Sequence, residues 1–160
     1  MKLLFICTHN RCRSILAEAI FNHYGKGLLQ AASAGSSPAE NVHPLTLQYL
    51  AESGIDTGAL RSQSWDELAH FKPDVVITVC DSAAQEPCPV WFGNVPKVQW
   101  SLPDPTRLSG TDAEVKSAFL ALILLLENRC QQLTQMEFPA HKPVNLAGLL
   151  TDIERRVKAG

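Results

Sequence analysis

The sequence predicts an α/β domain, a three-layer sandwich in which helices flank a central four-stranded parallel sheet. Two observations support this fold class. Short apolar runs alternate along the chain with segments of helical periodicity. The run Asp74–Cys80 is β-branched and apolar on both faces, which is typical of a strand at the centre of a parallel sheet. A length of 160 residues is that of one domain with a sizeable core.

Four apolar runs are expected to form the strands, namely Lys2–Cys7, Leu28–Ala34, Asp74–Cys80 and Lys97–Ser101. Helices are expected over Ser14–Tyr24, from Pro44 to near Gly54, after Ser64, and from Thr111 to about Glu137. Proline is favoured at the first position of a helix, and the serine and threonine each precede a glutamate at capping-box spacing. Residues 138–160 contain two prolines and a last short helix, which we expect to be a helical extension of the same domain.

Composition excludes several classes of protein. The chain is 46% hydrophobic and 19% charged with a formal net charge of -2, which is typical of a globular protein. This charge gives no field for nucleic acid, and the longest apolar stretch, Ala118–Leu126, is too short to span a membrane. An anion site must therefore be made locally. Residues 1–30 contain four basic residues and one acidic residue, so positive charge is concentrated there.

The five cysteines point to the position of the site. An odd number cannot pair completely within the chain, and the first residues do not resemble a signal peptide, so we expect a reducing cytoplasm. Ligands of parallel α/β sheets bind beyond the carboxyl ends of the strands. That rule selects the loops after Cys7 and after Cys80, which together hold four of the five cysteines.

The first of these loops has the chemistry of an oxyanion site. It follows a strand and opens a helix, so backbone N–H groups converge on a bound anion, and the Arg13 guanidinium can close on it. We expect this environment and a hydrogen bond from Ser14 to lower the pKa of Cys7 from about 8.5 by about two pH units. The residues expected to surround the oxyanion are Thr8, His9, Asn10, Arg11, Cys12, Arg13 and Ser14.

The run CTHNRCRS, with Cys7 and Arg13 as a C-x5-R signature, resembles the low-molecular-weight protein tyrosine phosphatases and the thiol-dependent arsenate reductases that share their fold. Further matches are Ser33-Ala34-Gly35, Val75–Cys80 and Asp104-Pro105. The resemblance covers about residues 1–130. It implies a fold like that of these phosphatases, with residues 1–137 as a phosphatase-like arsenate reductase domain.

The resemblance favours a reductase over a phosphatase. Cys80 and Cys88 resemble the two thiols that form a relay with the loop cysteine in the reductases. The phosphatases usually carry two tyrosines after their Asp-Pro, whereas this chain has Thr106-Arg107. His9 and Arg11 also depart from the family pattern, because smaller residues are common there, and eight positions separate Cys80 from Cys88 where some relatives have seven. These departures leave the identity of the reductant open.

The resemblance implies reduction of arsenate to arsenite, as in arsenic detoxification. Cys7 is expected to be the nucleophile, Asp104 the proton donor, and Cys80 and Cys88 the relay. Phosphate or sulfate is expected to fit the same loop. We expect no bound cofactor, an external reductant (thioredoxin, or glutathione with glutaredoxin), and a monomer without a nucleic-acid or membrane partner.

Alternatives remain open. The chain could be a low-molecular-weight protein tyrosine phosphatase that hydrolyses phosphomonoesters, or a non-catalytic oxyanion-binding or redox-sensing protein. A zinc site made by the four loop cysteines is disfavoured by their wide spacing. Asn10, Glu18 and Ser33 match residues that bind potassium in some reductases, but Trp65 falls where an aspartate is expected. Cys12 is assigned to loop packing, Cys130 to the core, and Asp104 could also be only a turn residue.

Overall fold

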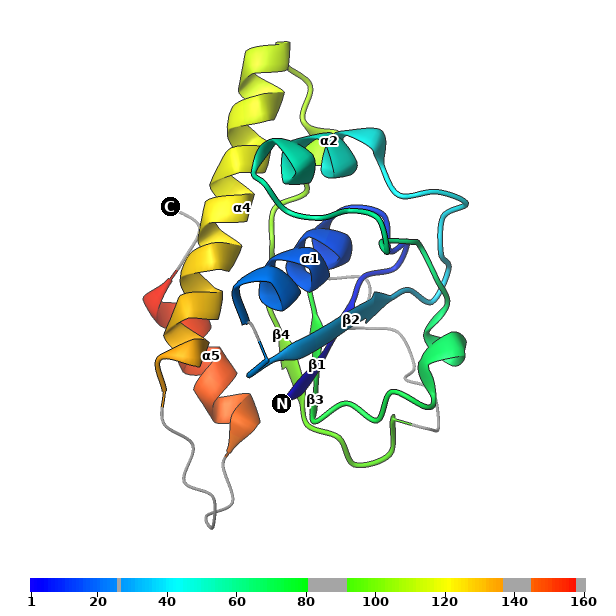
Figure 1. Cartoon of the computed structure of the whole chain (residues 1–160), viewed down its shortest axis with the longest axis vertical. Coiled ribbons are helices and arrows are strands. Elements are labelled where there is room, and N and C mark those ends of the chain that lie inside the picture. Colours follow the sequence, from blue (N-terminus) through cyan, green and yellow to red (C-terminus); the bar gives the residue numbers. More distant parts are fainter. Residues whose placement is uncertain (26, 81–91, 137–144, 158–160) are drawn as a thin grey trace.

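The computed structural model describes residues 1–25, 27–80, 92–136 and 145–157. Four parallel strands form one sheet in the order β2-β1-β3-β4 (Figure 1). The strands are β1 (Lys2–Ile6), β2 (Gln30–Ala34), β3 (Val75–Thr78) and β4 (Lys97–Gln99). The predicted α/β fold with a four-stranded parallel sheet is therefore confirmed, and β3 is one of the two central strands, as predicted.

The helices begin where the sequence signals predicted. They are α1 (Arg13–Gly25), α2 (Pro44–Glu52), α4 (Asp112–Thr134) and α5 (Leu146–Arg156), with short 3-10 helices η1 (Trp65–Leu68) and η3 (Pro105–Arg107). Ser64 forms the predicted capping box with Glu67, and Thr111 accepts a hydrogen bond from the backbone N–H of Glu114. None of the described helices is long and apolar enough to cross a membrane.

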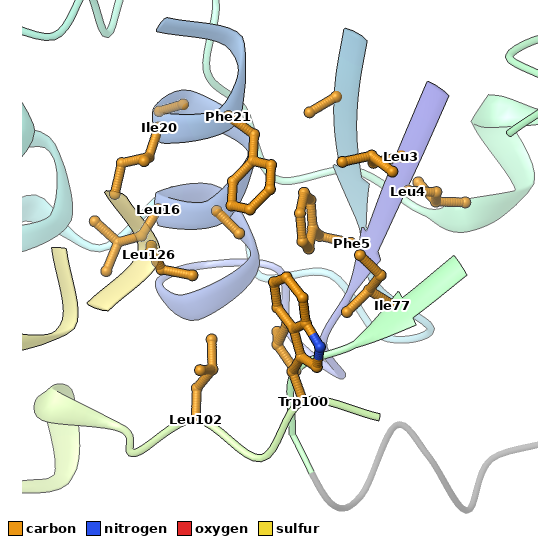
Figure 2. Close-up of a cluster of buried hydrophobic side chains, with 14 of the residues drawn as sticks. Leu3, Leu4, Phe5, Leu16, Ile20, Phe21, Ile77, Trp100, Leu102 and Leu126 are labelled. Atoms are coloured by element: carbon orange, nitrogen blue, oxygen red, sulfur yellow. The ribbon is translucent and has the colours of Figure 1, made fainter. Parts of the chain in front are cut away.

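The core lies between α1 and the sheet, and α4 packs against α1 (Figures 1 and 2). Phe5 of β1 packs edge-on against Phe21 of α1, with ring centroids 5.0 Å apart, and both rings contact Trp100. All four residues of β3 and residues 3–6 of β1 are buried, so both faces of these strands are covered. Burial on both faces explains why their sequences are continuously apolar.

The C-terminal helix α5 packs against α4 and β4. Leu150 and Ile153 are fully buried, and the Trp100 indole N–H donates a 3.1 Å hydrogen bond to the Leu150 carbonyl. The guanidinium of Arg129 lies 4.9 Å from the centre of the Trp100 ring, and its Nε donates to the Val157 carbonyl at 2.9 Å. These contacts attach the last helix to the edge of the sheet.

The sheet brings three distant segments together at one edge. Because the strands are parallel, the loop after β1, Cys80 after β3 and the segment after β4 all emerge from the same end. The segment after β4 leads to Asp104, which caps η3. The fold thus unites residues near positions 7, 80 and 104.

Candidate active site

The loop after β1 turns its carbonyl groups outward. The carbonyl oxygens of Thr8, His9 and Arg11 accept hydrogen bonds from the backbone N–H groups of Ser37, Ala39 and His43, at 2.9 to 3.0 Å. The C=O and N–H of one peptide unit point in opposite directions, so the following N–H groups are directed into the loop. The loop can therefore surround an oxyanion with N–H donors, as predicted from its place between a strand and a helix.

Asn10 attaches this loop to neighbouring segments through its buried side chain. It is fully buried in the left-handed region, with φ of 47°, a conformation in which asparagine is favoured over most side chains. Its Nδ2 donates to Ser14 Oγ at 2.8 Å and to Ser33 Oγ at 3.0 Å, and its Oδ1 accepts from the backbone N–H of Gln63 at 2.9 Å. The side chains of Asn10 and Ser14 thus tie the loop to β2, and neither lines the cavity described next.

A cavity of about 240 Å³ lies over the loop. Five of the predicted oxyanion residues line it, together with the predicted nucleophile, one predicted relay thiol and the predicted proton donor. Its lining residues are Cys7, Thr8, His9, Arg11, Cys12, Arg13, Cys80, Asp104, Thr106 and Arg107. His9 lies at its exposed rim, where Nδ1 donates to the Ser37 carbonyl at 3.1 Å.

Cys7 and Cys80 meet at the base of this cavity. Both are buried and line the cavity, and the Thr8 hydroxyl lies 3.8 Å from Cys80 Sγ, within hydrogen-bonding range. The hydrogen bond with Cys80 and burial raise the pKa of Cys7, against the opposing effects of Arg13 and the His9 N–H. The predicted lowering of the Cys7 pKa is therefore wrong, because the second thiol and burial outweigh the positive groups.

Asp104 connects the loop to the segment after β4. Its Oδ2 lies 3.6 Å from Arg13 Nη2, and Arg13 Nη1 also donates to the Leu102 carbonyl at 3.1 Å. Asp104 Oδ1 accepts hydrogen bonds from the N–H and hydroxyl of Thr106, at 3.0 and 2.6 Å. Burial opposes ionisation of this carboxyl, but Thr106, Arg13 and Arg107 outweigh it and lower the pKa of Asp104. Asp104 is thus both the cap of η3, the turn role considered above, and a partner of Arg13.

The other two described cysteines differ in environment. Cys12 lines the cavity but is buried, and burial raises its pKa to about 12 despite a hydrogen bond with Thr46. Cys130 is fully buried on α4, where burial raises its pKa to about 12. Both thiols are therefore protonated near neutral pH. Cys130 is a core residue, as predicted.

Gly35 allows the loop to lie close to the end of β2. A Cβ atom at this position would lie 2.5 Å from the Thr8 carbonyl oxygen and 2.7 Å from that of Cys7. Because both atoms belong to the backbone, a larger residue would displace the loop. The glycine that follows Ser33-Ala34 thus has a steric role beside the site.

The predicted potassium residues are also brought together. Glu18 Oε1 accepts from the Ser33 N–H at 2.8 Å and hydroxyl at 3.2 Å, and Ser33 in turn accepts from Asn10. Burial raises the pKa of Glu18 to about 7, although the hydrogen bonds from Ser33 lower it. Asn10 presents its amide nitrogen to Ser33, and its oxygen is used by Gln63, so the cluster offers few open oxygen ligands. Within the described residues, no group of three His, Cys, Asp or Glu side chains could hold a metal ion.

Sequence reasoning missed some residues of the site, and one predicted residue lies outside the part of the chain that the structure describes. Sequence reasoning did not assign Thr106 and Arg107 to the site, although their position directly after Asp104 and Pro105 is the available signal. Gln63 was also missed, because its contact with Asn10 spans 53 positions and has no local pattern. Cys88, predicted to be the second relay thiol, lies outside the described residues, as does most of the loop that contains it.

Comparisons with known proteins agree with this geometry. A family model described as low molecular weight phosphotyrosine protein phosphatase matches residues 2–142. The arsenate reductase of Halalkalibacterium halodurans is 35% identical over 117 residues, which cover 73% of this chain and 83% of that protein. The glutaredoxin arsenate reductase of Synechocystis sp. is 33% identical over 107 residues, covering 65% of this chain and 78% of the relative.

Solved structures of similar fold include an arsenate reductase in the phosphate binding state, with a TM-score of 0.67 and 27% identity over 83% of this chain and 95% of the other. The thioredoxin-dependent arsenate reductase of Corynebacterium glutamicum gives a TM-score of 0.60 and 29% identity, covering 84% of this chain and 63% of that one. The loop, its arginine and the sheet that carries them agree with the match to the family model over most of the chain. The chain therefore belongs to the low molecular weight phosphotyrosine protein phosphatase family.

Proposed function

We propose that this protein reduces arsenate to arsenite through a thiol relay that begins at Cys7. The observation that carries the proposal is that two buried thiols, Cys7 and Cys80, line the same cavity, where the Cys80 thiol raises the pKa of Cys7. Hydrolysis of a phosphomonoester needs only one nucleophilic thiol, whereas reduction needs a second thiol that can reach the first. The names of the relatives support the same choice of substrate.

In the first step the Cys7 thiolate attacks arsenic. A sulfur–arsenic bond forms, one arsenic–oxygen bond breaks, and the departing oxygen leaves as water with a proton from Asp104. Arg13 and the loop N–H groups hold the other oxygens. Thr106 and the two arginines favour the carboxylate form of Asp104, but a bound anion repels that charge and favours the protonated carboxyl that the step requires.

In the second step the Cys80 thiolate attacks the sulfur of Cys7. A disulfide forms, the sulfur–arsenic bond breaks, and its electron pair stays on arsenic, which leaves as arsenite. The Thr8 hydroxyl can donate a hydrogen bond to Cys80 as the thiolate forms. The two thiols are thus oxidised by two electrons, and arsenic(V) becomes arsenic(III).

Cys88 then completes the relay. Its thiolate attacks Cys80, which transfers the disulfide to Cys80 and Cys88 and releases the Cys7 thiolate. An external dithiol reduces the new disulfide, and we propose thioredoxin, or glutathione with glutaredoxin, in the cytoplasm. Relatives of both kinds exist, one named as glutaredoxin-linked and one as thioredoxin-dependent.

The test is arsenate-dependent oxidation of NADPH, with a thioredoxin system and with a glutathione and glutaredoxin system in turn. Hydrolysis of p-nitrophenyl phosphate is measured in parallel, because it requires Cys7 but not the relay. The variants Cys80→Ser and Cys88→Ser are expected to lose arsenate turnover and to keep the hydrolysis. Cys130→Ala, which removes a thiol from the core, is the matched control and is expected to keep both activities.

Three results would contradict the proposal. Arsenate turnover that persists in both relay variants would exclude the relay. Efficient hydrolysis of aryl phosphates by the unmodified protein, with no NADPH oxidation in either system, would identify a phosphatase instead. Binding of arsenate without any turnover would indicate a non-catalytic oxyanion-binding protein.

A further inference from the structure

The two oxygens of the Asp104 carboxylate have different partners. Oδ1 is held by Thr106, which donates both its backbone N–H and its hydroxyl. Oδ2 faces two guanidinium groups at the same distance, Arg13 Nη2 at 3.6 Å and Arg107 Nε at 3.6 Å. The carboxylate is thus oriented on one side by hydrogen bonds and balanced on the other by two positive charges.

The two arginines differ in how firmly they are placed. The side chain of Arg13 is 16% exposed and is also bonded to the Leu102 carbonyl, so its position is set by the loop and the segment after β4. The side chain of Arg107, the last residue of η3, is 81% exposed, and its ion-pair partner is Asp104, the cap of that helix. Arg107 nevertheless lines the oxyanion cavity. Its guanidinium therefore lies beside Asp104, and its exposed side chain does not pack in the core.

We propose that Arg107 is a positioning residue for Asp104, whose guanidinium sets the pH at which Asp104 gains and loses its proton. This inference rests on the proposed function, in which Asp104 donates a proton to the departing oxygen. The other titratable and charged groups that act on Asp104 are Arg13, the thiol of Cys12 and the imidazole of His43. Unlike these groups, Arg107 is a largely exposed cation, so it can be replaced without disturbing packing.

The direction of the effect follows from electrostatics. A positive charge near a carboxylate favours its ionised form, so loss of Arg107 favours the protonated carboxyl. Thr106 and Arg13 remain in place, so the carboxyl group keeps its orientation. Because Arg107 is largely exposed, solvent screens its charge, and we expect an upward shift of about 0.5 to 1 pH unit. High salt should reduce this shift further.

The experiment measures the titration of the Asp104 carboxyl carbon by 13C NMR in the anion-free protein. The midpoint is expected to move upward by about 0.5 to 1 pH unit in Arg107→Gln and to stay near that of the unmodified protein in Arg107→Lys. Arg156→Gln removes an exposed arginine from α5 and is the matched control, with no expected shift. Asp104→Asn identifies the carbon signal by its loss.

Turnover gives a second, independent readout. The limb of the pH profile of kcat/KM that disappears in Asp104→Asn should move upward in Arg107→Gln and be restored in Arg107→Lys. An unchanged carboxyl titration in Arg107→Gln, or the same shift in Arg107→Lys, would overturn the inference. A shifted titration with no turnover of arsenate or aryl phosphate would support the Arg107–Asp104 relationship and contradict the proposed function instead.

Discussion

Cys7 and Cys80 line the same cavity at the carboxyl ends of β1 and β3, which are neighbours in the sheet, and the Cys80 thiol raises the pKa of Cys7. The two residues are 73 positions apart, and the parallel pairing of the strands brings them together. The Cys80 thiol raises the pKa of Cys7, whereas the positive charge of Arg13 lowers it. The pKa of Cys7, the nucleophile of the proposed reaction, is therefore higher than the positive groups of the loop would make it by themselves.

Replacing Cys80 by alanine should lower the pKa of Cys7. The hydrogen bond with Cys80 is the main cause of the raised pKa, and its loss leaves Arg13 and the His9 N–H to stabilise the thiolate. The pH at which Cys7 reacts with iodoacetamide, followed by mass spectrometry, should fall by about one pH unit or more. Cys130→Ala is the control. An onset that stays in place or rises in Cys80→Ala would show that burial alone controls this thiol.

Asn10→Ala should destabilise the protein and disorder the loop. The change removes donors to Ser14 and Ser33 and the acceptor for Gln63, and it places alanine at φ of 47°. Loss of a buried hydrogen-bonding group and the strained backbone together predict a loss of about 2 to 4 kcal/mol in the free energy of unfolding. Urea denaturation measures it, with the exposed Asn94→Ala as control. Equal stability of the two variants would refute the supporting role of Asn10.

Glu18→Gln should make the stability of the protein less sensitive to pH. Burial raises the pKa of Glu18 to about 7, so the folded state binds this proton more tightly than the unfolded chain does. Its contribution to stability is therefore full below the unfolded pKa near 4.5 and is lost as the pH rises to about 7. Glutamine stays neutral and still accepts hydrogen bonds from Ser33.

The measurement is urea denaturation of both proteins at pH 5 and pH 8. Relative to the unmodified protein, the variant is expected to gain about 2 kcal/mol between these two values, since each pH unit is worth at most about 1.4 kcal/mol. The exposed Glu52→Gln is the matched control. A difference between Glu18→Gln and the unmodified protein that does not change with pH would exclude a buried, titrating carboxyl.

Much of this architecture could be predicted from sequence because it depends on local signals. The apolar run of β3 and the serine before η1 each identify an element from a few neighbouring residues. Cys7 and Arg13, which line one cavity, could likewise be placed together from sequence because both belong to one loop. The state of the Cys7 thiol could not be predicted in this way, because it depends on Cys80, which reaches it only through the order of the strands.

The same limit explains the other differences at the site. Asn10 lies in the loop and was assigned to the oxyanion, but its side chain turns toward Ser33 and Gln63, which are distant in sequence. Arg107 was noticed only as a departure from the tyrosines of related phosphatases. Its relation to Asp104 depends on the conformation of η3, which no pattern in the sequence specifies.

The last helix provides the final prediction, because apolar residues in Leu146–Arg156 do not reveal what they pack against. Leu150 is fully buried, and its carbonyl accepts the hydrogen bond of Trp100, which belongs to the central core. If α5 is an extension of the same domain, Leu150→Ala should lower the free energy of unfolding of the whole chain by about 2 to 4 kcal/mol. Tryptophan fluorescence and far-ultraviolet circular dichroism should then report one shared transition in urea. The exposed Arg155→Ala should change little, and two separate transitions would show instead that α5 unfolds independently of the sheet.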